Sequence, residues 1–444
     1  MTTNRQIGLL SLPVLVAALG YFVDVYDLLL FTIVRQPSVM SVGATVETII
    51  VDSAHIINWQ MSGLLIGGIL WGVIGDKYGR LKVLFGSIML YSVANILTSF
   101  VHNVDQYAYC RFIGGIGLAG ELGAGITLVS EMLPKNKRGI GTSMVAGIGL
   151  FGAVFAYFTF HFSKQWGIGY SINPFHLNIL GQEFAYGGLR INDWRLCYQI
   201  GGVLGVFLLF LRIKVAESFM FESAKLANIA KGNFFQFFTN SKRFSKYIKA
   251  ILIGLPTWFV IGVLVNYSNK FAADLYGKNL IDSGKSIMFA YVGIAIGDIV
   301  IGYVSQYFKS RKKALLAFYS LNTIAMVLFF SVLNSDDNKM YAICGLLGFS
   351  TGYWAIFNTM AAEQFGTNLR ATAATTIPNM VRGALPLINF LFLDILQKKL
   401  GWTIIHSGIA TGMIVMIITI IAFVFTEETY HKDLDYLELD NPLP

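Results

Sequence analysis

The sequence predicts an all-α membrane protein whose twelve transmembrane helices form two pseudo-symmetric six-helix halves. Of its 444 residues, 55% are hydrophobic and only 13% are charged. Apolar runs of roughly 18 residues or more recur along the chain, which is typical of membrane-spanning helices. Sequence patterns of the first half also return in the second. These runs lack the period-two alternation of a membrane β-barrel, and helical backbone groups can pair within their own segment.

The apolar runs divide the chain into spans, two halves, a middle loop and a tail. The predicted spans cover residues 9–34, 58–76, 81–101, 107–131, 138–162, 194–213, 248–272, 284–307, 313–333, 339–362, 371–397 and 402–425. The first run is too long and too acidic for a cleavable signal peptide. The predicted domains are an N-terminal half (1–213), a cytoplasmic middle loop (214–247), a C-terminal half (248–425) and a cytoplasmic tail (426–444).

The loop 163–193 is long and aromatic, and two structures suit it. One is a short helix in the membrane interface, and the other is a cap over the outer vestibule. The sequence does not decide between them.

The formal net charge of +8 is carried mainly by loops on one side of the predicted membrane. These include the segment from Arg212 to Lys249, and by the positive-inside rule they place both termini in the cytoplasm. We therefore expect a monomeric, multi-pass protein in lipid, in the bacterial cytoplasmic (inner) membrane, with no nucleic-acid partner. The three cysteines lack metal-ligand spacing, so no metal or other cofactor is expected.

Two internal matches define the repeat. The stretch "GVIGDKYGRLK" at 72–82 corresponds to "GYVSQYFKSRK" at 302–312, an offset of 230 residues. A second match, between 120–139 and 352–371 at an offset of 232, aligns Glu131 with Glu363 and Arg138 with Arg370. Two matches at nearly the same offset predict parallel six-span halves around a central cavity, with a substrate near the membrane midplane.

The motif "GDKYGRLK" resembles the signature loop of the major facilitator superfamily, with Asp76 and Arg80 in the expected places. The resemblance implies the fold of that superfamily and a latch on the inward side. We expect a cytoplasmic gate made of Asp76, Arg80, Glu131, Arg138, Asp298, Glu363 and Arg370. The alternative is a plain set of solvated, positive-inside loop ends, whose ion pairs contribute little.

A narrower resemblance links "DVYDLLLF" in the first span and "RFIGGIGLAGELGAGI" in the fourth to the metabolite:proton symporter family. Sugar porters share other features, such as the "EET" near Glu427. The GxGxxG within the fourth span is not a dinucleotide fingerprint, because no strand precedes it. Small residues that allow close helix packing explain it better.

Four charged residues buried in the first half are the predicted proton-coupling group: Asp24, Asp27, Arg111 and Glu121. Charged groups within a span usually face the bundle interior and have a partner or a function. Asp27 lies roughly 10 Å, and Arg111 about 6 Å, below the outer end of its span, so the long arginine side chain can reach the carboxylate. Asp24 and Glu121 match in depth nearer the middle, without an evident cation. The alternatives are a structural ion pair and a hydrogen-bonded, protonated Glu121.

Arg382 is the predicted ligand for a substrate anion, because it lies between Pro378 and Pro386 on a helix that these prolines loosen. The alternative is an ion pair with Asp298 or another carboxylate. Aromatic and amide residues are expected to line the same cavity, although each could equally serve helix packing. They are Tyr21, Trp258, Asn266, Tyr267, Tyr353, Trp354 and Asn358.

The sequence therefore favours a secondary active transporter that carries a small polar metabolite, with a carboxylate-bearing one favoured, together with protons by alternating access. A facilitator and a drug/proton antiporter of the same fold are alternatives. A non-transporting receptor is less favoured, since no output module is evident. An enzyme is not expected, because no nucleophile–base arrangement, metal cluster or phosphate loop stands out.

Overall fold

The computed structural model describes residues 8–45, 47–134, 137–171, 175–179, 182–186, 190–213, 233–276, 281–331, 337–434, 436 and 438. Within these residues, twelve helices are long and apolar enough to cross a membrane. The predicted helical membrane fold of twelve spans is confirmed.

The spans are built from continuous and broken helices. The first six comprise α1 (Leu12–Ser41), α2 (Ile49–Tyr78), α3 (Arg80–Thr98), α4 (Val104–Leu118) with α5 (Glu121–Met132), α6 (Arg138–Trp166) and α7 (Asp193–Arg212). The last six comprise α10 (Ser241–Leu252) with α11 (Leu255–Phe259) and the π-helical η1 (Val260–Val265), α13 (Ser283–Tyr307), α14 (Arg311–Ser331), α15 (Asp337–Thr351) with α16 (Trp354–Glu363), α17 (Arg370–Gly383) with α18 (Leu385–Asn389) and the π-helical η2 (Phe390–Lys399), and α19 (Ile404–Val424). The short helices are α9 (Gln236–Thr239) and α12 (Ser268–Tyr276).

The seventh span begins earlier than residue 248, the predicted start. Helix α10 starts at Ser241, where the Asn240 side chain caps it by accepting from the backbone N–H groups of Lys242 and Arg243. The prediction was wrong here because the first turns of α10 are basic, and hydropathy detects only the continuously apolar part. Of the predicted middle loop, residues 214–232 lie outside the described part of the chain.

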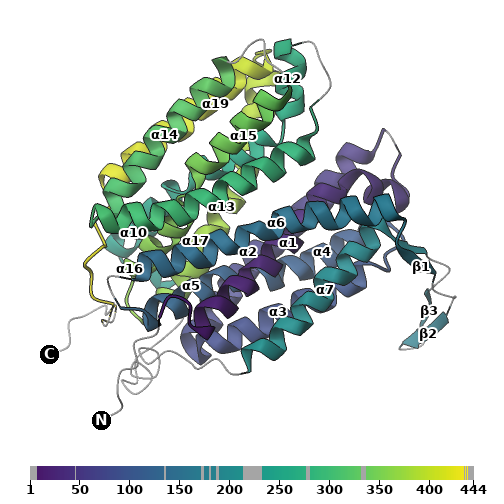
Figure 1. Ribbon diagram of the computed structural model, residues 1–444, viewed down its shortest axis with the longest axis horizontal. Coiled ribbons are helices and arrows are strands. Elements are labelled where there is room, and N and C mark those ends of the chain that lie inside the picture. Colours follow the sequence, from purple (N-terminus) through teal and green to yellow (C-terminus); the bar gives the residue numbers. More distant parts are fainter. Residues whose placement is uncertain are drawn as a thin grey trace.

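The loop 163–193 contains strands where the sequence allowed a helix. Strand β1 (Gly169–Ser171) pairs antiparallel with β4 (Arg190–Asn192), and β2 (Phe175–Ile179) pairs antiparallel with β3 (Gln182–Tyr186). These strands project from the bundle beyond the ends of α6 and α7 (Figure 1). The interfacial-helix alternative is therefore wrong for these residues, and the vestibule cap stays a prediction.

The helices form two groups, α1–α7 and α10–α19, that meet through α6 with α13 and α16, and through α17 with α2 and α5. In Figure 1 the groups approach each other near α5 and α16 and diverge towards α12. Glycines permit the close contacts. A Cβ on Gly72 would lie 2.8 Å from the Cα of Thr372, and one on Gly147 would lie 2.8 Å from the carbonyl oxygen of Ala295. The interface between the groups is thus packed backbone against backbone.

Candidate functional site

The predicted contact between Asp27 on α1 and Arg111 on α4 is confirmed. The Nη1 of Arg111 lies 2.9 Å from the Oδ1 of Asp27, and neither side chain is exposed. Arg111 also donates through Nη2 to Asn95 on α3, and its guanidinium lies 4.7 Å from the ring centroid of Tyr198 on α7. The pair therefore joins four helices of the first half, and loss of either charge leaves the other buried without its partner.

Glu121, at the start of α5, has a cation that the sequence reasoning missed. Its two carboxylate oxygens accept from the guanidinium of Arg212, in the last turn of α7, and Arg212 also donates to the Leu84 carbonyl at 3.1 Å. The expectation of two carboxylates without a cation is wrong. Arg212 was counted among the basic cytoplasmic residues because it ends an apolar span, but a long arginine side chain in a last turn can reach back into the bundle.

Asp24 lies on α1 near this second ion pair, but differs from the other two carboxylates. Its side chain is buried, and its Oδ1 has no hydrogen-bond partner among the described residues. Gly20 precedes it by one helical turn on the same face. A Cβ on Gly20 would overlap both Arg212 and Glu121. A carboxyl in this setting is costly to ionise, which suits a group that carries a proton.

A cavity lies between the two groups of helices. It is lined by Tyr21, Val25, Leu28 and Leu150 from the first half, and by Thr257, Trp258, Ile261, Tyr291, Ile294, Trp354 and Arg382 from the second. Four residues of the predicted substrate site, Tyr21, Trp258, Trp354 and Arg382, are thus brought together.

Arg382 reaches this cavity from the break between α17 and α18. Its Nη1 donates to the Oδ1 of Asn379 at 2.9 Å, and its guanidinium lies 5.9 Å from the ring centroid of Trp354. Its Nε has no hydrogen-bond partner in the described part of the chain. The alternative ion pair with Asp298 is not formed there. The Oδ1 of Asp298 instead accepts from the backbone N–H of Ala355 at 2.8 Å, at the start of α16.

Four other predicted substrate residues do not line the cavity: Asn266, Tyr267, Tyr353 and Asn358. Tyr267 packs against Phe392, and Asn266 follows the π-helical η1. Both residues follow a π-helical stretch, whose i→i+5 hydrogen bonds change the direction in which later side chains point. Asn358 is buried, and neither of its amide atoms has a described partner.

Asp76 on α2 makes hydrogen bonds from the first half to the second. Its carboxylate accepts from the backbone N–H groups of Ala371 (3.0 Å) and Thr372 (2.8 Å), and from the Thr372 hydroxyl (2.6 Å). These groups open α17, whose N-terminus favours a negative charge. Asp76 of the first half therefore caps a helix of the second.

Glu131 is the second link. It accepts from Arg80 of its own half and from Arg370 of the other half, each at 2.9 Å. Asp76, Arg80, Glu131 and Arg370 are all buried. We call these four residues the charged end of the bundle. They form one cluster that spans both halves, as expected for a gate.

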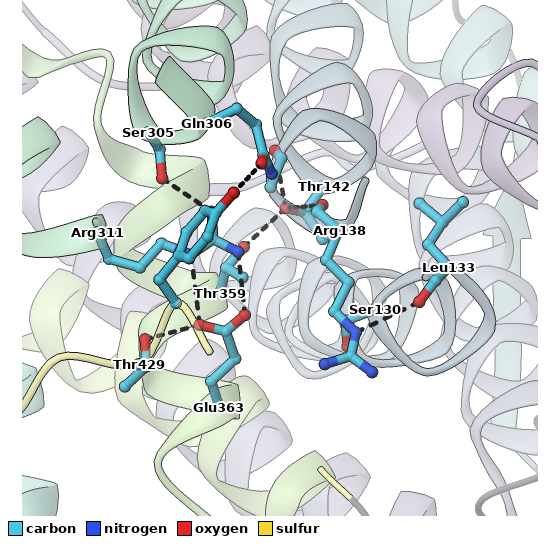
Figure 2. Close-up of polar contacts among 12 residues, drawn as sticks. Ser130, Leu133, Arg138, Thr142, Ser305, Gln306, Arg311, Thr359, Glu363 and Thr429 are labelled. Carbon is cyan, nitrogen blue, oxygen red and sulfur yellow. Dashed lines mark hydrogen bonds and ion pairs between the residues drawn. The ribbon is translucent and has the colours of Figure 1, made fainter. Parts of the chain in front are cut away.

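The equivalent residues of the second half are arranged differently. Figure 2 shows Glu363 facing Arg311, which donates to it at 3.1 Å, and accepting from Thr429 at 2.7 Å. Arg138 donates through Nε to the Leu133 carbonyl at 3.3 Å. Among the described residues, Glu363 contacts Arg311 and Thr429, and Asp298 contacts Ala355, so neither carboxylate joins the charged end. Sequence reasoning missed Arg311, which lies one position from exact alignment with Arg80 in the repeat.

The segment after α19 covers this side of the second half. The carboxylate of Glu428 accepts from the backbone N–H groups of Arg311 (2.9 Å) and Lys312 (3.1 Å), and from the Ser310 hydroxyl. Burial raises the pKa of Glu428, but these hydrogen bonds and one from the Tyr430 N–H outweigh it and hold the pKa below its ordinary value. Further along, Leu434 accepts from Arg370 of the charged end.

Comparisons with known proteins agree with this architecture. Residues 11–388 match the family model described as Major Facilitator Superfamily. The niacin transporter of Acinetobacter baylyi is 24% identical over 406 residues, with 84% of each chain covered. The sialic acid transporter of Escherichia coli is 24% identical over 370 residues, with 82% of each covered. The structure of a proton:xylose symporter of the same superfamily matches with a TM-score of 0.73 at 15% identity, covering 96% of this chain and 97% of that one.

Proposed function

Since this chain belongs to the Major Facilitator Superfamily, and is a metabolite transporter rather than an enzyme, we propose that it carries a small carboxylate-bearing metabolite together with protons. The observation that carries the proposal is the Asp27–Arg111 pair, buried within the first half and 2.9 Å apart. Protonation of Asp27 would release Arg111 and so change the packing of the helices that this pair joins.

The other buried carboxyls of the first half supply a further place for the proton. Asp24 has an unpartnered oxygen, whereas Glu121 is held by Arg212. In this proposal Asp24 or Asp27 takes the proton, Arg111 drives it off, and the Glu121–Arg212 pair fixes the helices around them. A carboxyl that alternates between paired and protonated states can couple proton movement to a conformational change.

Arg382 is the proposed ligand of the substrate carboxylate. A guanidinium binds a carboxylate by charge-assisted hydrogen bonds, and this one lies in the cavity between the halves. Niacin and sialic acid, named for two of the relatives, are both carboxylic acids, which supports the same substrate class.

The charged end is the proposed gate of alternating access. Its contacts join the halves and must break when that side opens. The basic loops favour an orientation with this end and both termini in the cytoplasm of a bacterial inner membrane, and we propose a monomer made of the two halves given above.

The proposal is tested by uptake into proteoliposomes. A thermal-shift screen of organic acids, betaines, sugars and nucleosides first identifies a ligand, since binding stabilises the folded protein. An inward proton gradient should then drive its accumulation, and a protonophore should abolish it. Counterflow without accumulation would instead indicate a facilitator, and outward drug flux an antiporter.

A further inference from the structure

The cavity side chains restrict the ligand more narrowly than the proposed function does. Of the eleven described residues that line the cavity, Arg382 alone is charged, and the Val, Leu, Ile, Trp and Tyr side chains make up nine. The walls are therefore aliphatic and aromatic, with a single cation. A ligand with a second charge would bury it without a counter-charge, at a large cost in free energy.

Two buried donors in this cavity lack acceptors. The Nε of Arg382 and the Nε1 of Trp258 have no hydrogen-bond partner among the described residues, and these side chains are only 4% and 8% exposed. Guanidinium and indole N–H groups donate and cannot accept. Buried donors of this kind are normally satisfied, so both call for an oxygen acceptor from the ligand.

The surroundings of Arg382 also favour a flat ligand. Asn379 holds the Nη1 of Arg382, which fixes the plane of the guanidinium beside the Trp354 ring. The aromatic and aliphatic lining is chemically suited to an aromatic body, whereas a polyol would bury many hydroxyls against apolar walls.

We infer that this cavity takes a monoanion with one carboxylate on a compact, planar aromatic body. The inference rests on the proposed function for the location of the substrate site, and deepens it. The carboxylate meets Arg382, with the Trp258 N–H as a second donor, and the ring lies against Trp354 and the aliphatic wall.

Binding to the purified full-length protein tests the inference, with benzoate as the probe. Tryptophan fluorescence and thermal shift are measured with benzoate, benzamide, cyclohexanecarboxylate, terephthalate and xylose. Benzoate should bind saturably and raise the unfolding temperature. Each of the other four should bind at least about tenfold more weakly, because each lacks the charge or the flat ring, or adds polar groups.

Variants locate the site. Arg382→Gln should weaken benzoate binding by about tenfold or more, and Trp258→Phe, which keeps a smaller aromatic ring but loses the N–H, by a few-fold. Trp402→Phe is the matched control, because Trp402 is 45% exposed and does not line the cavity. If Arg382→Gln does not fold, the Trp258→Phe result decides.

The inference is overturned if benzoate does not bind, or if any of the other four probes binds as well as benzoate. It is also overturned if benzoate binding is unchanged in every variant that folds. Its failure is distinct from failure of the proposed function. Benzoate binding without proton-driven accumulation would rule out proton coupling and keep the inferred ligand class. Proton-driven accumulation of a sugar would instead keep the proton coupling and rule out an aromatic carboxylate as the ligand class.

Discussion

Asp24, Asp27 and Glu121 are three buried carboxyls with three different surroundings. Asp27 has Arg111, Glu121 has Arg212, and the Oδ1 of Asp24 has no described partner. Depth along the helices was enough to predict the first pair. It was not enough for the second, because the reach of Arg212 back into the bundle depends on side-chain direction, which the position in the sequence does not give.

Substitution of Gly20 tests how much the Glu121–Arg212 pair contributes to stability and transport. In Gly20→Ala the new Cβ would overlap both side chains, so the ion pair must shift or break. We expect destabilisation of about 1–3 kcal/mol, typical of overpacking, and strongly reduced transport. Gly125→Ala is the matched control, because its Cβ would meet only the Ala17 Cβ at 3.7 Å. Thermal unfolding and uptake of both variants check the prediction, and equal behaviour of the two would contradict it.

At the scale of elements, the segment after α19 behaves as a cap on α14. Glu428 accepts from the backbone N–H groups at the start of that helix, which are otherwise without intrahelical partners. Because these hydrogen bonds favour the carboxylate, the pKa of Glu428 lies below its ordinary value. The stabilisation it provides is complete above the ordinary pKa and is lost as the pH falls through the lowered one.

The pH dependence of unfolding tests this cap. The unfolding temperature of the natural protein should exceed that of Glu428→Gln at neutral pH, because glutamine lacks the charge that favours a helix N-terminus. The difference should shrink as the pH falls below about 4.5, where the unfolded carboxyl protonates first. A difference that is constant from pH 7 to pH 3 would refute this role of the carboxylate.

Some of the helices and strands could be predicted from the sequence, and others could not. Hydropathy predicted every span, because length and apolar character suffice for a membrane helix. It missed the strands β1–β4 and the basic start of α10 at Ser241, which no apolar run marks. Asn266 and Tyr267 do not line the cavity as expected, and the π-helical η1 before them leaves no hydropathy signal. The Arg382 position was predicted because Pro378 and Pro386 flank it visibly.

At the scale of the whole molecule, the charged end is asymmetric. Glu131 binds an arginine from each half, whereas its repeat partner Glu363 binds Arg311 of its own half and Thr429 of the segment after α19. The repeat itself gives a reason. Asp76, which caps α17, corresponds to Gln306, which contacts Tyr430 instead. Only one of the two pseudo-equivalent interfaces therefore carries an acidic cap.

The variants Glu131→Gln and Glu363→Gln distinguish a carboxylate that locks the two halves together from one that only stabilises the fold locally. Glu131→Gln removes the carboxylate that Arg80 and Arg370 share across the two halves, so we expect the equilibrium to move at least about tenfold towards opening of the charged end, or about 1.4 kcal/mol. Glu363→Gln should lower the unfolding temperature without this shift. Distances between spin labels on the two halves report the balance, and an unchanged distribution in Glu131→Gln would rule out the lock.

Proton coupling through the Asp27–Arg111 pair is tested most directly by proton-driven accumulation of an identified ligand in proteoliposomes containing the natural protein or Asp27→Asn. We expect the natural protein to concentrate the ligand when the proton gradient points inward, whereas Asp27→Asn should still exchange ligand in counterflow but no longer accumulate it. Equal, protonophore-sensitive accumulation by the two proteins would contradict the role of the Asp27–Arg111 pair in coupling.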